Sequence, residues 1–137
     1  MGITLHGIVE AWVERERPSR TGWENFATVE FNKNHALFYA LQEHVNDRGR
    51  RWLTGYADDG KRSNEDELSW DAREVISDDI ANDGFWVTAD ELAAGLKNEP
   101  SYDVGYDWRA TARATLAFMR EFEKEWPKVR LLLYRIT

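Results

Sequence analysis

The sequence predicts an α+β fold in which a small antiparallel sheet is covered by helices. Two segments, 3–13 and 24–32, alternate apolar and polar residues with the period of two that half-buried strands show. Two others, 37–45 and 108–122, repeat apolar residues every three or four positions, as amphipathic helices do. A chain of 137 residues has room for one domain with its own core, and no linker or repeat divides it. We therefore expect residues 1–137 to form a single domain.

The first two strands are expected to pair as a hairpin. In the first strand, Leu5 and Val9 fall on one face. The polar side chains of His6 and Glu10 fall on the other face, which we expect to be the wetter one. The run Pro-Ser-Arg-Thr-Gly at 18–22 is typical of a turn, after which alternation resumes.

Four helices are expected between this hairpin and the end of the chain. Three of them start at capping residues, and two of these have the capping-box spacing, in which a Glu follows the cap by three positions. Gly or Pro stands where three of them should stop. The expected helices run from Asn34 to Gly49, from Asn64 to Ile80, from Thr88 to Pro100, and from Trp108 to Pro127, with a short extended run Phe85-Trp86-Val87 before the third.

The last strand, 128–137, is apolar on both faces, because leucines occupy positions 131, 132 and 133 in succession. A solvated edge strand would not have this pattern. Either the strand is central, with helices on one side and another layer on the other, or its second face packs on a second subunit. A homo-oligomer formed through this C-terminal strand is therefore expected.

Composition excludes several classes of site and location. The chain has no Cys, so disulfides, Cys-ligated metals and thiol nucleophiles are absent. His35 and His44 are nine positions apart on one predicted helix and face opposite ways, so we expect no metal and no cofactor. No apolar run reaches the length of about 18 residues needed to cross a membrane, and the start lacks a secretory pattern. We expect a cytoplasmic protein that does not contact membranes.

The net charge of −7 is concentrated in one segment. Residues 65–83 hold eight carboxylates against the single Arg73, and the rest of the chain is balanced. A helix in this segment could be an ordinary solvated face, or it could present acidic side chains to a basic partner. The acidity and a pI near 5.0 disfavour generic nucleic-acid binding. The candidate partner-binding residues are Asp71, Glu74, Asp78 and Asp79.

Catalytic motifs are weak, whereas residues suited to binding are plentiful. The run 55–61 resembles a phosphate-binding loop, but Arg62 stands where a magnesium-binding Ser or Thr belongs. No nucleophile elbow or dinucleotide fingerprint occurs, and a metal-dependent phosphodiesterase stays the minority alternative. Trp52 and Trp86 lie in predicted loops or element ends near an Arg cluster at 48–51. Planar rings beside guanidinium groups suit a nucleotide-like ligand, although the same rings could simply close the core.

Four stretches of the chain form a recognisable combination. They are Gly-Ile-Thr-Leu-His-Gly at 2–7, Asn-His-Ala-Leu-Phe at 34–38, Asp-Gly-Phe-Trp-Val-Thr-Ala-Asp-Glu-Leu at 83–92, and Val-Arg-Leu-Leu-Leu-Tyr at 129–134. Together they resemble small accessory proteins of bacteriophages and prophages. The resemblance implies an anti-defence protein that works in the bacterial host cytoplasm. One mode of such proteins is to sequester a nucleotide-derived immune signal in a pocket between subunits.

The leading hypothesis is therefore a non-enzymatic, oligomeric sponge that achieves immune evasion by binding such a signal without turnover. Arginines would pair with phosphate, tryptophans would stack on rings, and the other site residues would make polar contacts. The alternatives are an acidic inhibitor that mimics nucleic acid and blocks a host defence complex, and a hydrolase that degrades the signal. The predicted ligand-binding residues are Asn34, His35, Arg50, Arg51, Trp52, Trp86 and Thr88.

Overall fold

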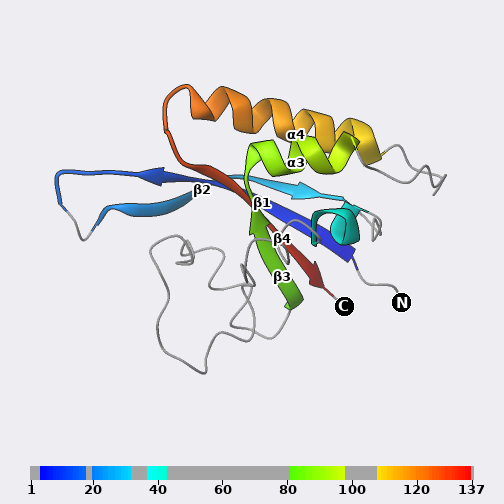
Figure 1. Ribbon diagram of the computed structural model, residues 1–137. Helices are drawn as coiled ribbons and strands as arrows, with labels where there is room; N and C mark the ends of the chain where they lie inside the picture. The colour runs from blue at the N-terminus through cyan, green and yellow to red at the C-terminus, as the bar shows by residue number, and fades with distance from the viewer. Residues whose placement is uncertain (1–3, 18–19, 32–36, 43–80, 98–107, 137) are drawn as a thin grey trace.

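The structure, a computed structural model, describes residues 4–17, 20–31, 37–42, 81–97 and 108–136 (Figure 1). Four strands form one antiparallel sheet in the order β2-β1-β4-β3, and helices lie on it. This arrangement confirms the α+β class. The elements are β1 (Thr4–Val13), β2 (Gly22–Glu30), β3 (Ala81–Val87), α3 (Ala89–Lys97), α4 (Trp108–Glu123) and β4 (Val129–Ile136), together with a helical segment at 37–42.

The predicted hairpin is confirmed, because β1 pairs with β2 along its length. The register shifts once, between Val9 and Glu10 of β1. An irregularity of this kind increases the local twist of the strand pair. Near the turn, Trp12 and Trp23 stand opposite each other, which brings two large rings to one end of the hairpin.

The two apolar faces of β4 follow from its place inside the sheet. β4 pairs with β1 along one edge and with β3 along the other. Leu131 and Leu133 belong to the core under the helices, while Leu132 on the opposite face is also fully buried. The strand is therefore central, as the first of the two sequence alternatives predicted. The homo-oligomer stays a prediction.

The start of α3 has the capping geometry that the sequence predicted. The amide of Glu91 donates to Thr88 Oγ1 at 3.2 Å, and the amide of Thr88 donates to Glu91 Oε1 at 3.1 Å. These reciprocal bonds satisfy two backbone donors that the helix itself leaves open. The long helix is confirmed as α4. The predicted acidic helix and the predicted ends at Asn34, Gly49 and Pro100 lie outside the described residues.

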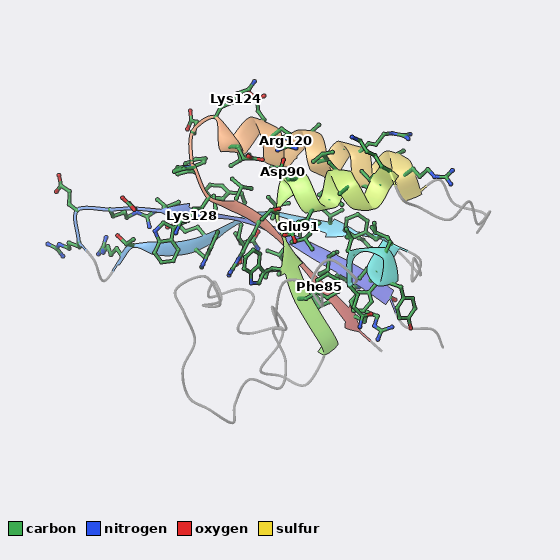
Figure 2. All side chains as sticks on the ribbon, viewed as in Figure 1. Phe85, Asp90, Glu91, Arg120, Lys124 and Lys128 are labelled. Atoms are coloured by element: carbon green, nitrogen blue, oxygen red, sulfur yellow. The ribbon has the colours of Figure 1, made fainter. Side chains whose placement is uncertain are left out.

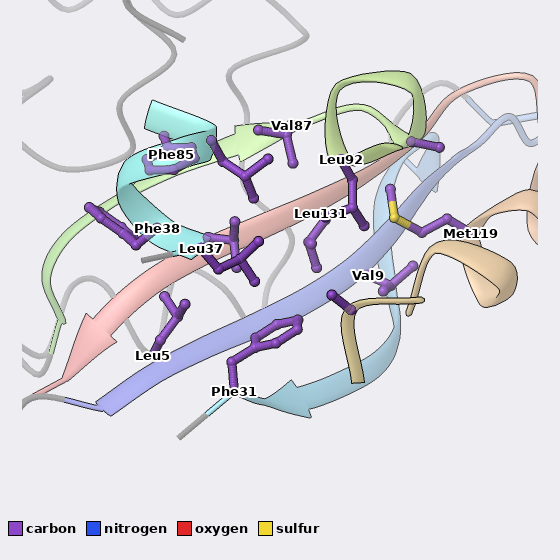
Figure 3. Close-up of a cluster of buried hydrophobic side chains, with 14 of the residues drawn as sticks. Leu5, Val9, Phe31, Leu37, Phe38, Phe85, Val87, Leu92, Met119 and Leu131 are labelled. Carbon is purple, nitrogen blue, oxygen red and sulfur yellow. The ribbon is translucent and has the colours of Figure 1, made fainter. Parts of the chain in front are cut away.

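Helices α3 and α4 and the segment 37–42 cover one face of the sheet and enclose an apolar core (Figures 1 and 3). The rings of Phe38 and Phe85 pack at 4.8 Å between centroids, which joins the segment 37–42 to β3. A Cβ added to Gly95 would come within 2.5 Å of a Leu41 methyl group, so the glycine lets α3 approach that segment closely. Every side chain in this cluster is apolar.

Candidate ligand-binding site

The sheet face opposite the helices carries a buried ion pair. Glu10 of β1 and Arg130 of β4 stand directly opposite each other in the strand register. Nε and Nη2 of Arg130 both donate to Glu10 Oε1, at 3.0 and 2.9 Å, and the two side chains are 0% and 1% exposed. The expectation that Glu10 faces solvent is therefore wrong. Its charge is tolerated in the interior because a guanidinium meets it with good geometry.

Two tryptophans flank this ion pair. The guanidinium carbon of Arg130 lies 3.8 Å from the ring centroid of Trp23 on β2 and 5.7 Å from that of Trp86 on β3. A cation over an aromatic face is attracted by the negative charge of the ring, more strongly where water is excluded. Arg130 therefore links residues from all four strands, since it also pairs with Glu10 of β1.

A cavity of about 500 Å³ opens beside this group, where β3 runs into α3 and the connection from α4 enters β4. Trp23, Trp86 and Arg130 line it from the sheet, and Thr88 and the first residues of α3 line it from the helix. Lys128 lines it from the connection. The cavity therefore combines aromatic rings with positively charged and hydrogen-bonding groups.

The carboxylates at the rim are engaged in structural contacts. Arg120 of α4 donates to Asp90 at 2.7 Å and to Glu123 at 3.3 Å (Figure 2). The hydrogen bond that Arg120 donates to Asp90 raises the pKa of the Arg120 guanidinium, which therefore stays protonated. Glu91 closes the capping box with Thr88. By contrast, Lys128 makes no ion pair with any residue that the structure describes, and its ammonium group is available at the rim.

The structure brings together two of the residues that the sequence singled out. Trp86 and Thr88 line the same cavity, one from the end of β3 and the other from the cap of α3. The remaining predicted residues lie outside the described residues, so the structure does not place them. They are the ligand-binding candidates Asn34, His35, Arg50, Arg51 and Trp52, and the partner-binding candidates Asp71, Glu74, Asp78 and Asp79.

Sequence reasoning missed four residues of this region. Glu10 and Arg130 interrupt apolar strands, and the pairing of an acid on one strand with a base on another was the available signal. Trp23 was missed because its strand was expected to begin at residue 24, whereas β2 begins at Gly22. Lys128 lies between Pro127 and an apolar run and has no motif of its own.

Two searches of the described part of the chain gave negative results. No group of three or more His, Asp or Glu side chains there has the arrangement of a metal site. Among the described helices, none combines the length and the apolar character that crossing a membrane requires. Comparison with protein families, with curated proteins and with solved structures gives no match for this chain.

Proposed function

We propose that this protein binds a nucleotide-like small molecule in the cavity between Trp23 and Trp86 and holds it without turnover. The observation that supports the proposal is the cavity itself, which joins two tryptophan rings, a guanidinium group and a lysine in about 500 Å³. Pockets for small ligands are typically about 300–1,000 Å³, mostly apolar, with a few convergent polar groups. The cavity has this size, and half of its lining is apolar, while the other half holds an arginine, a lysine, a threonine and three carboxylates.

The base of such a ligand would stack on an indole ring. Stacking on aromatic side chains is tolerant of the identity of the base and contributes about 1–3 kcal/mol per base. Trp86 and Trp23 both offer ring surface to the cavity, and the contact of Arg130 with Trp23 holds that ring in place. The aromatic part of the site is therefore preorganised, which lowers the entropic cost of binding.

The anionic group would meet Lys128 and the first turn of α3. The amino-terminal end of a helix carries a partial positive charge, and the first residues of α3 line the cavity. Arg120 reduces the repulsion from Asp90 and Glu123, because its single positive charge is shared between the two carboxylates. Lys128 is the cation at the rim that would meet the anionic group.

Binding without chemistry is favoured by how the carboxylates of the cavity are used. Asp90 and Glu123 bind Arg120, and Glu91 caps α3. A general base must be within hydrogen-bond reach of the proton that it abstracts, and these groups are held by other partners. In a phage-type accessory protein, this activity would remove a nucleotide-derived immune signal of the host from circulation.

The test is a thermal-shift and calorimetric screen of the purified protein against mononucleotides, cyclic nucleotides and ADP-ribose, with mass spectrometry of the recovered ligand. A ligand that binds only the folded state raises the melting temperature. Lys128→Glu should weaken binding about tenfold or more, as expected for the loss of a charged contact. Lys124→Glu, an exposed lysine outside the cavity, serves as the matched control and should leave the affinity unchanged.

Three results would contradict the proposal. If no nucleotide raises the melting temperature, the ligand is not nucleotide-like. If the Lys128 and Lys124 variants lose affinity equally, the ligand does not bind in the cavity that Lys128 lines. If the recovered ligand has an altered mass, the protein is an enzyme that converts the ligand and not a sponge.

A further inference from the structure

A second, smaller cavity adjoins the first. It measures about 260 Å³ and is lined by Trp12, Glu14, Glu125, Trp126, Pro127 and Lys128. The two cavities share Pro127 and Lys128, which lie in the connection from α4 to β4 (Figure 2). Each cavity has two tryptophans of its own in its walls. The connection from α4 to β4 therefore lies between two cavities that are lined by aromatic rings.

Three contacts fix the position of one cavity relative to the other. The ring of Trp12, in the second cavity, meets the ring of Trp23, in the first, edge to face at 5.5 Å between centroids. The amide of Trp12 donates to the carbonyl of Lys128 at 2.9 Å. The ammonium nitrogen of Lys128 lies 5.9 Å from the Trp12 ring centroid. The lysine is thus held at the boundary by its backbone, and its ammonium group lies on the side of the Trp12 ring.

The second cavity suits one part of a ligand rather than a whole one. Its volume is below the range of about 300–1,000 Å³ in which complete small ligands bind. Trp12 and Trp126 line it, and the Trp126 ring is held by stacking on Phe122 at 5.3 Å between centroids, so the surface that the two indoles leave to the cavity suits one planar ring. Glu14 and Glu125 form no ion pair within the described part of the chain, so their oxygens can accept hydrogen bonds from hydroxyl or amino groups.

We infer that the ligand is a dinucleotide, with one ring in each cavity and its phosphate linker on Lys128. This inference rests on the proposed function and specifies the class of ligand for the same site. Two rings joined by a linker bind more tightly than either alone, because the second ring binds at a high effective concentration once the first is seated. The lining of the second cavity includes two carboxylates, and Lys128 lines both cavities, so a phosphate linker that passes from one to the other would meet its charge.

The experiment compares two-ring probes with one-ring probes by calorimetry. The probes are NAD, cyclic di-AMP and cyclic di-GMP against AMP and GMP. We expect at least one two-ring probe to bind about tenfold or more tightly than its mononucleotide, since one stacked base contributes about 1–3 kcal/mol. Trp12→Ala should remove that difference by weakening the two-ring probe alone.

A second variant keeps the test independent of folding defects. Glu14→Ala combined with Glu125→Ala changes two exposed side chains, so the fold should be retained, as circular dichroism and melting would verify. The double variant should weaken the two-ring probe severalfold and change mononucleotide binding less than twofold. Glu16→Ala with Glu121→Ala, both exposed and outside the cavities, is the matched control.

The outcomes separate the inference from the proposed function. Equal affinity for two-ring and one-ring probes, or equal weakening of both by Trp12→Ala, would overturn the dinucleotide and leave the single-ring site in place. Failure of every probe to bind would overturn both.

Discussion

The two faces of the sheet are built from different kinds of side chain. Under the helices, β1 and β4 contribute the apolar side chains of Leu5, Val9, Leu131 and Leu133 to the core. On the opposite face, the same two strands contribute a buried ion pair and the stacked rings of His6 and Tyr134, whose centroids are 5.6 Å apart. Both faces are buried at these strands, so burial alone does not account for the difference.

The comparison indicates a division of roles between the faces. An apolar core stabilises the fold without directional contacts, and many sequences of suitable volume can fill it. A buried ion pair is a poor source of net stability, because desolvation of the two charges opposes their attraction. Arg130, Trp23 and Trp86 of this face line the cavity, whose other walls come from α3, from the end of α4 and from the connection into β4. We therefore interpret the apolar core as the source of stability and the ion-pair face as the part of the sheet that contributes to the ligand site.

The largest expected effect tests the ion pair. Arg130→Met should lower the free energy of unfolding by about 4 kcal/mol, because it leaves the Glu10 carboxylate buried without its cation. The double variant Glu10→Leu/Arg130→Met should recover most of that loss and still bind no ligand. Chemical denaturation of the two variants gives the measurement. If Arg130→Met is as stable as the parent protein, the ion pair does not distinguish this face from the apolar one.

The next effect tests the apolar face at the adjacent position of the same strand. Leu131→Ala should lower the free energy of unfolding by about 3 kcal/mol, because a fully buried side chain leaves a cavity. Ligand affinity of the folded fraction should be unchanged, since Leu131 does not line the cavity. Denaturation and calorimetry on the same sample measure both quantities. A large loss of affinity here would mean that the two faces are coupled.

A smaller effect tests the junction between the faces, at the start of α3. Thr88→Ala removes the side-chain acceptor of the Glu91 amide and should cost about 1 kcal/mol of stability. Thr88→Ser keeps a hydroxyl at the cap and should retain most of the stability. Thermal melting of the pair is the measurement. Equal melting temperatures for the two variants would show that the hydroxyl contributes nothing as a cap.

The smallest effect is a pH dependence confined to the opposite face. Burial raises the pKa of the Tyr134 phenol above its value of about 10 in the unfolded chain. Between the two pKa values the folded state holds a proton that the unfolded state has lost, so stability falls as the pH rises through this window. Tyr134→Phe should lose less stability than the parent between about pH 9 and pH 11. If the curves of stability against pH for the parent and for Tyr134→Phe are parallel in this range, Tyr134 is not the group that titrates.

Much of the fold could be predicted from local patterns. Alternation in β1 predicted the hairpin, and Thr88 with Glu91 predicted the start of α3, because both signals depend on neighbours in the sequence. The two apolar faces of β4 predicted a central strand or a subunit contact; the sheet order places β4 between two strands, and the subunit contact stays a prediction.

The candidate site was less predictable because its parts meet only through long-range pairing. Glu10 and Arg130 are 120 residues apart, and neither the acid nor the base alone signals a buried partner. Trp86 and Thr88 were selected for lying beside a predicted helix start, which is a local signal. Trp23 and Lys128 join them only after β2, β1, β4 and β3 are placed side by side.

The central position of β4 also sets the order of events during synthesis. β1 and β3 are both made before residues 129–136, and the strand that joins them is β4. The ribosome therefore releases the hairpin, β3 and both covering helices while the middle of the sheet is still missing. Closure of a loop this long is slow, and apolar strand edges stay open until it occurs. The nascent chain is consequently most exposed to aggregation just before β4 emerges, and the ligand cavity, which needs Arg130 from that strand, is among the last features to form.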